Sequence, residues 1–216
     1  MMRSAFFGGT FDPIHNGHLD VAEAARRALH FDRISFIPAS VPPHRAGPRA
    51  SAAHRFAMAA LATQGRESFA VSDLEMRSTD PSYTSTTLDR LERSGLNTLT
   101  CYLAIGADAF SEIGTWKAFP ELLDRCSFIV VSRPTFPVAA LPDALPDLAA
   151  RMTPVPADRR IGAASSPGIF LVDAPTAPVS STEIRRRVAE GAPIHDLVPA
   201  AVAEYIKKHG LYIEKS

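Results

Sequence analysis

The sequence predicts an α/β fold, a Rossmann-like doubly wound parallel sheet with a small C-terminal helical appendage. Two observations support this prediction. Short apolar runs alternate with stretches of helical periodicity over most of the chain, and the first run leads through a glycine pair into an amphipathic helix. With 216 residues, 46% of them hydrophobic, the chain has enough apolar side chains for one well-cored domain over residues 1–216.

The predicted strands and helices follow one another along the chain. Strands rich in β-branched and aromatic residues are expected at 4–7, 34–37, 69–71, 99–105, 128–131 and 169–172. Helices are expected at 18–29, 50–63, 84–94 and 118–124. Alternation of this kind is typical of a parallel sheet covered on both faces, and such sheets bind ligands beyond the carboxyl ends of their strands. The first strand-to-helix turn lies at that edge.

Residues 134–168 break the alternation. They contain seven prolines and many alanines, a composition that predicts an irregular, mobile loop with one short helix near 147–151. We interpret the segment as a loop of the same domain rather than as a linker between domains.

A C-terminal helical part is predicted over residues 179–216. Ser180 and Glu183 form a capping-box pattern that opens a helix ending at Gly191. The last helix is expected at 199–210, with a proline in its first turn and a glycine at its end.

The turn at residues 8–18 reads Gly-Gly-Thr-Phe-Asp-Pro-Ile-His-Asn-Gly-His. Its first two glycines lack a Cβ, so a nucleotide can lie against the backbone. With Asn16 as the predicted N-cap, free amides at the helix start favour an anion, and His15 and His18 can both donate to its phosphate oxygens. A lone histidine here would more often be a cap or a surface residue, but two in register with the glycines favour a phosphate site. Asp12, in an Asp-Pro pair, is interpreted as a turn former rather than a metal ligand.

A second anion site is predicted where the helix after Ser180 begins. Ser181 and Thr182 offer hydroxyls and free amides, and Arg185 lies one turn further on. The alternative is an ordinary capped helix with a basic outer face. A nucleoside triphosphate needs donors for several phosphates at once, which favours a site built from both turns.

Two further motifs are candidates for substrate contact. Two prolines stiffen the loop that presents His44 and Arg45 near the ligand edge of the sheet, although a rigid exposed loop is the alternative. Tyr83 and Thr84 open a helix whose first amides could hold a carboxylate. Trp116 offers a flat face for an aromatic ring, with core packing as the alternative.

Composition excludes several classes of protein. Lys and Arg total 23, as do Asp and Glu, so no basic field exists to bind nucleic acid and no nucleic-acid partner is expected. Cys101 and Cys126 lack metal-ligand spacing, which indicates buried thiols in a reducing compartment and no metal site built from protein side chains. Neither a signal peptide nor a membrane-spanning run is present, so we expect no membrane partner and a cytoplasmic location.

Together these motifs resemble those of bacterial nicotinate-nucleotide adenylyltransferases, within the nucleotidyltransferases that carry a His-x-Gly-His motif. The resemblance spans nearly the whole chain, because it also includes residues 38–45, 81–84, 105–108 and Trp116. It implies transfer of the adenylyl group of ATP to nicotinate mononucleotide, which yields deamido-NAD and pyrophosphate. The small-molecule partners would be these two substrates.

The resemblance also assigns residues to this reaction. Catalysis would fall to His15, His18 and Arg185. ATP would be bound by Gly8, Gly9, Thr10, His15, His18, Ser181, Thr182 and Arg185. Nicotinate mononucleotide would be bound by His44, Arg45, Tyr83, Thr84, Asp108 and Trp116. Mg²⁺ is expected mainly on the ATP phosphates, because this ion needs few protein ligands.

Two kinds of alternative function remain open at the level of sequence. The acceptor could be nicotinamide mononucleotide, pantetheine phosphate or, with CTP, glycerol phosphate. The chain could also be a nucleotide sensor without catalytic activity, although intact histidines and Arg185 argue against this.

Overall fold

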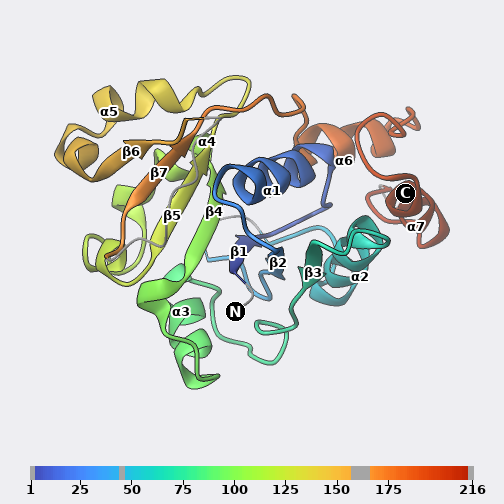
Figure 1. The fold of residues 1–216 in the computed structure, drawn as a ribbon. Coiled ribbons are helices and arrows are strands. Elements are labelled where there is room, and N and C mark those ends of the chain that lie inside the picture. Colours follow the sequence, from blue (N-terminus) through green and yellow to red (C-terminus); the bar gives the residue numbers. More distant parts are fainter. Residues whose placement is uncertain (1–2, 44–46, 157–165, 214–216) are drawn as a thin grey trace.

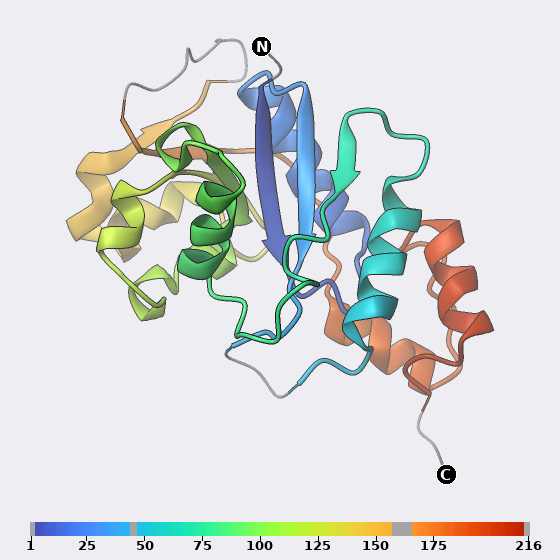
Figure 2. The ribbon, with the colours of Figure 1, turned by 90° about the horizontal axis from the view of Figure 1, so that it is seen from below.

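The computed structural model describes residues 3–43, 47–156 and 166–213 (Figures 1 and 2). Its centre is a seven-stranded parallel sheet in the order β3-β2-β1-β4-β5-β7-β6. Helices cover both faces of the sheet, so the predicted α/β, Rossmann-like class is confirmed.

The elements have the following bounds. The strands are β1 Ser4–Gly9, β2 Arg33–Pro38, β3 Phe69–Val71, β4 Tyr102–Gly106, β5 Ser127–Val131, β6 Met152–Pro154 and β7 Ile169–Val172. The helices are α1 Asn16–Ala28, α2 Ala52–Thr63, α3 Thr84–Arg93, α4 Ala107–Phe110, α5 Leu141–Ala144, α6 Ser181–Ala189 and α7 Ala200–Lys208. Short 3₁₀ turns lie at Thr98–Thr100, Ile113–Thr115, Glu121–Asp124, Val138–Ala140 and Pro146–Arg151.

The central strands bury side chains on both faces of the sheet. In β5, Ile129 and Val131 join one core cluster with α1, α2, α6 and α7, whereas Phe128 and Val130 join a second cluster with α3 and α4. Successive strand side chains point to opposite faces, so a strand covered on both sides needs an unbroken apolar run. This requirement explains why the apolar runs predicted the strands.

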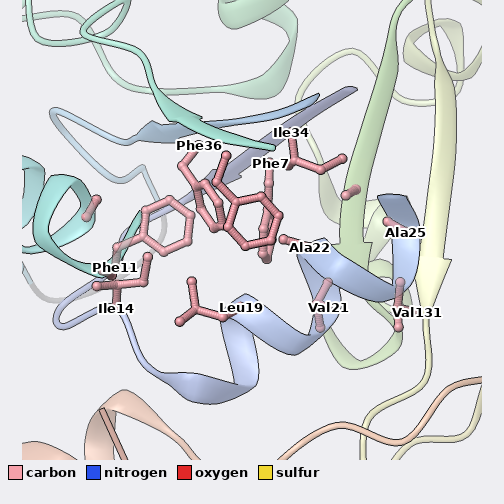
Figure 3. Packing of buried hydrophobic residues seen from close by; sticks show 14 of the residues in the cluster. Phe7, Phe11, Ile14, Leu19, Val21, Ala22, Ala25, Ile34, Phe36 and Val131 are labelled. Carbon is pink, nitrogen blue, oxygen red and sulfur yellow. The ribbon is translucent and has the colours of Figure 1, made fainter. Parts of the chain in front are cut away.

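The first core cluster extends up to the glycine-rich turn. Figure 3 shows the rings of Phe7, Phe11 and Phe36 beside Leu19 of α1. The Phe7 and Phe11 ring centroids are 5.5 Å apart in an edge-to-face arrangement, a geometry that aromatic pairs favour. The turn after β1 is thus anchored by packing as well as by hydrogen bonds.

The order of the strands places the turn at a switch point. β1 pairs with β2 on one side and with β4 on the other. The chain runs from β1 through β2 to β3 in one direction, and then crosses back to β4 on the other side of β1. Crevices at such points, outside the carboxyl ends of the strands, are where open α/β sheets bind ligands. The turns after β1, β4 and β5 all lie at this edge.

Three expectations of secondary structure were wrong in detail. The strand predicted at 99–105 begins only at Tyr102, because the preceding residues form a 3₁₀ turn capped by Asn97. The helix predicted at 118–124 is a four-residue 3₁₀ turn that begins after Pro120, which has no backbone N–H to donate. Helix α1 begins at Asn16 rather than at 18, and His15 rather than Asn16 is the N-cap.

The segment 134–168 is more regular than predicted. It contains α5, two 3₁₀ turns and the edge strand β6, whose Met152 pairs with Ile169 of β7. Leu141 and Leu148 are buried in the second core cluster, which anchors these short turns to the sheet. Residues 157–165 lie outside the described part of the chain, and so does that portion of the predicted loop.

The predictions about the two cysteines and about membrane-spanning segments can be compared with the structure. Cys101 and Cys126 are both buried free thiols, and burial raises the pKa of Cys126 to about 12. Within residues 3–43, 47–156 and 166–213, no helix is long and apolar enough to cross a membrane.

Candidate active site

The turn after β1 is held in shape by a packed phenylalanine. Phe11 is 2% exposed and has a φ of 50°, and its ring lies against the backbone of Gly9. A Cβ built on Gly9 would lie 2.7 Å from that ring, a distance that side chains essentially never tolerate. Glycine at this position therefore allows the turn to close over β1.

The two histidines of the motif lie face to face. The rings of His15 and His18 are stacked with centroids 3.7 Å apart, and His15 is only 3% exposed. The backbone N–H of His15 donates to Nδ1 of His18 over 3.3 Å. Since Nδ1 accepts this bond, the proton of neutral His18 lies on Nε2, which can donate to a ligand.

Both histidines are held in the neutral state. Burial, reinforced by the positive charge of Arg133, lowers the pKa of His15 to about 3. Burial, then the neighbouring His15 and Arg133, lowers the pKa of His18 well below its ordinary value. A neutral imidazole donates a hydrogen bond from one ring nitrogen only, and for His18 this nitrogen is Nε2.

Helix α6 begins directly against this turn (Figure 1). Ser180 is its N-cap and accepts from the backbone N–H of Glu183 over 3.2 Å. The reciprocal half of the predicted capping box is missing, because the Glu183 carboxylate pairs with Arg186 and Arg187. Ser181 donates its hydroxyl to the Pro13 carbonyl over 2.9 Å.

Arg185 joins the two predicted anion sites. Its Nη1 donates to the carbonyl of Asp12 over 2.7 Å, and its Nη2 donates to Oγ1 of Thr182 over 3.2 Å. The Arg185 side chain is 28% exposed, so a phosphate could reach it from solvent. The structure thus brings Ser181, Thr182 and Arg185 together with the histidine turn.

The Asp12 carboxylate is fully engaged in holding the turn. It accepts from the backbone amides of Arg49 and Ala50 over 2.8 and 3.1 Å, and from the Tyr212 hydroxyl over 2.8 Å. Burial raises the pKa of Tyr212, which keeps its hydroxyl protonated as a donor. These contacts agree with the interpretation of Asp12 as a turn former, and the sequence alone did not indicate Tyr212 as its partner.

A cavity of about 250 Å³ lies beside the turn, at the carboxyl edge of the sheet. Of the predicted site residues, Gly8, Gly9, Thr10, Tyr83, Thr84 and Trp116 line it. Lys117 and Glu75, which the sequence analysis did not single out, line it as well. Nζ of Lys117 lies 4.8 Å from the centre of the Tyr83 ring, so a cation borders the aromatic part of the cavity.

The remaining predicted residues are placed differently. Asp108 is exposed on the first turn of α4 and does not line the 250 Å³ cavity. His44 and Arg45 lie outside the described residues.

A second cavity, of about 820 Å³, lies against α6 and is bordered by Arg49, Thr182, Arg185, Arg186 and Tyr212.

A buried arginine supports the loops around the site. Arg55 of α2 is fully buried, and within the described part of the chain its guanidinium donates only to backbone carbonyls. The acceptors and distances are Thr10 at 2.7 Å, Ala39 at 2.6 Å, Ser40 at 3.0 Å and Ala50 at 3.2 Å. One side chain therefore fixes the turn after β1 and the loop after β2, and no periodic pattern in the sequence indicates it.

The neutral histidines predict a pH-dependent stability. The folded pKa of each lies below the unfolded value of 6.5, so the unfolded chain binds more protons than the folded one as the pH falls below 6.5. The free energy of unfolding should then decrease on acidification, by up to about 1.4 kcal/mol per pH unit for each histidine. Urea titrations between pH 7 and pH 4 measure this slope.

The contribution of one histidine can be isolated by substitution. His15→Asn keeps a good N-cap and should flatten the slope, whereas His195→Asn, at an exposed position, should leave it unchanged. Equal slopes in wild type and His15→Asn would contradict the assignment of His15 as a buried neutral group.

Comparison with known proteins first defines the class. A family model described as cytidylyltransferase-like matches residues 6–187. This match covers the histidine turn, nearly all of α6, and the sheet except for the first two residues of β1. The fold and the two facing turns are therefore those of a nucleotidyltransferase.

Individual relatives then define the family. A nicotinate-nucleotide adenylyltransferase of Roseiflexus sp. strain RS-1 is 44% identical over 95% of both chains. One from Pectobacterium atrosepticum is 38% identical, over 97% of this chain and 98% of its own. The chain belongs to the nicotinate-nucleotide adenylyltransferase family. In fold it is similar to a nicotinic acid mononucleotide adenylyltransferase of Plasmodium falciparum complexed with NaAD (TM-score 0.74, 19% identity, 98% of both chains).

Proposed function

We propose that residues 1–216 act as one nucleotidyltransferase domain that transfers the adenylyl group of ATP to nicotinate mononucleotide, yielding deamido-NAD and pyrophosphate. The observation that carries this proposal is the position of the cavity. A neutral histidine pair and Arg185 meet at one turn, and an aromatic cavity bordered by a cation adjoins the same turn.

The chemistry fits the donors at this turn. An oxygen of the acceptor's 5′-phosphate attacks the α-phosphorus of ATP, and the bond from that phosphorus to the pyrophosphate oxygen breaks. The nucleophile is already an anion, so no activated serine or cysteine is needed. The protein aligns the two phosphates and stabilises the charge that develops on the leaving pyrophosphate.

Each residue of the turn has a role in this scheme. Nε2 of His18 donates to a phosphate oxygen, and the stacked His15 fixes its orientation. When ATP binds, Arg185 gives up its hydrogen bond to the Asp12 carbonyl and donates to the ATP phosphates instead. Gly8, Gly9 and Thr10 supply backbone against which the nucleotide lies, and Ser181 and Thr182 add donors from α6.

The cavity fits the pyridine end of the acceptor. Trp116 presents its ring, and the amides of Thr84, Ser85 and Thr86 at the start of α3 have no acceptor among the described residues. A carboxylate is favoured at such a helix start. Lys117 adds a positive charge at the same cavity, which favours nicotinate over the uncharged amide. Asp108, His44 and Arg45 would contact the ribose phosphate part.

Lys117 makes the choice of acceptor testable. We expect Lys117→Met to lower the ratio of kcat/KM for nicotinate mononucleotide to kcat/KM for nicotinamide mononucleotide about 10-fold, because one charge-assisted contact is lost. Steady-state assays with both acceptors measure this ratio. Lys207→Met, on the exposed end of α7, is the matched control, and an unchanged ratio in Lys117→Met would contradict the role of Lys117.

A divalent cation fits this site through the substrate. In the described part of the chain, no group of three or more His, Cys, Asp or Glu side chains could hold a metal ion, while His18 and Arg185 can hold the phosphates that carry it. Mg²⁺ bound through ATP phosphates would neutralise part of their charge. The buried free thiols agree with a cytoplasmic location, where cysteines stay reduced.

One assay tests the proposed function. ATP, Mg²⁺ and nicotinate mononucleotide are mixed with the protein, and pyrophosphate and deamido-NAD are measured together. Stoichiometric formation of both supports the proposal. A folded protein that binds ATP but releases no pyrophosphate would instead be a nucleotide sensor.

A further inference from the structure

Arg133 lies where the two phosphate-binding turns meet. It follows β5 by two residues, at the carboxyl edge of the sheet. Its Nη1 donates to the carbonyl of Gly17 over 3.3 Å, and its Nη2 donates to the carbonyl of Val179 over 2.9 Å. Gly17 lies between the two histidines, and Val179 immediately precedes the N-cap of α6. One guanidinium therefore bridges both turns.

Two glycines of the sequence motifs make room for this side chain. A Cβ on Gly17 would lie 2.8 Å from Nη1 of Arg133, and a Cβ on Gly106 would lie 3.2 Å from its Cγ and Cδ. The aliphatic stem of Arg133 thus passes the end of β4, and its head reaches the start of α1. A side chain at either position would displace the arginine or the turn.

No carboxylate of the described residues neutralises the charge of Arg133. Among the described residues it forms no ion pair, and its two hydrogen bonds go to carbonyl oxygens. The positive charge of Arg133 acts on His15, the N-cap of α1, and on His18 in the first turn of α1. Oδ1 of Asp108 on α4 borders the Cβ position of Gly106, as the stem of Arg133 does. An uncompensated cation beside an imidazole favours the neutral ring.

We propose that Arg133 is a positioning residue of the adenylyl-transfer site, which fixes the histidine turn relative to the start of α6 so that His18 and Arg185 reach one triphosphate together. This inference rests on the proposed function. Arg133 acts through the backbone of Gly17 and Val179, and a displacement of about 1 Å between catalytic groups is enough to lower a rate about 10²-fold. Substitution of Arg133 should therefore change kcat and KM for ATP, and should leave binding in the pyridine cavity unchanged.

Kinetics of Arg133→Met provide the first test. We expect kcat to fall about 10-fold to 10²-fold and KM for ATP to rise, with KM for nicotinate mononucleotide within about twofold of wild type. Arg133→Lys restores the charge but not two hydrogen bonds from a planar fork, so it should recover only part of kcat. The matched control is Arg151→Met. Arg151 likewise donates to a backbone carbonyl, that of Leu123, and it pairs with Asp124. We expect Arg151→Met to keep wild-type kinetics.

A second readout does not depend on turnover. In the substrate-free protein, NMR titration of the histidine rings should show the pKa values of His15 and His18 higher in Arg133→Met than in wild type, and closer to wild type in Arg133→Lys. Wild-type kcat and KM for ATP in folded Arg133→Met would overturn the inference. So would equal losses for both substrates with unchanged histidine titrations, which indicate a general structural role. Absence of pyrophosphate release from the wild-type protein would instead refute the proposed function.

Discussion

Replacing His18 by alanine is expected to lower kcat for pyrophosphate release about 10²-fold or more while leaving the protein folded. The His18 ring is the one whose tautomer the structure fixes, with Nδ1 accepting from the His15 amide and Nε2 free to donate. Alanine removes a preorganised donor from the place where negative charge develops. It also removes the stacking partner of His15, so part of the loss comes from a less ordered turn.

Controls separate the donor from the packing. His18→Gln, which offers an amide N–H on a side chain of similar reach, should retain more activity than His18→Ala. His195→Ala, at an exposed position, should behave as wild type. If His18→Ala turned over at the wild-type rate, the histidine turn would not be the site of adenylyl transfer.

Of the substitutions considered, Arg55→Met is expected to cause the largest loss of stability. The free energy of unfolding should fall by about 3 kcal/mol or more. The native guanidinium satisfies four backbone carbonyls around the site, and methionine leaves these acceptors without a donor. The cost of burying the arginine charge offsets part of this loss, which is why the expected value is below the sum of four charged hydrogen bonds. Urea denaturation followed by circular dichroism measures the change.

The comparison variant for Arg55 is Arg66→Met. Arg66 is exposed and lies 5.8 Å from the centre of the Phe69 ring, so its loss should change the free energy of unfolding by about 0.5 kcal/mol or less. A change of similar size in both variants would show that the contacts of Arg55 to the loops around the site contribute little.

Periodicity predicted the elements that bury apolar side chains on two faces. β5 and β7 were found because every residue of these strands is buried. β6 was missed because it ends in a proline and exposes two of its side chains, whereas β3, equally short, has neither feature. A short edge strand is defined by its neighbour in the sheet, and this information is absent from a local window.

The candidate site was predictable only where its chemistry repeats a known sequence pattern. The histidine turn and the start of α6 were identified from residue type and spacing, and the structure places them in contact through Arg185 and Ser181. Arg133, Lys117 and Tyr212 were not identified. Each is a single polar residue in a loop or segment whose significance arises from a partner far away in the sequence.

The bond between Tyr212 and Asp12 has a consequence for how the protein is made. The two residues are 200 positions apart, so during synthesis the first turn emerges from the ribosome long before the phenol that helps to hold it. A product terminated just before residue 212 would contain every residue of both phosphate-binding turns and still lack one of the three donors that the described residues offer to the Asp12 carboxylate. The shape of a turn near the start of the chain thus depends in part on a tyrosine that is synthesised about 200 residues later.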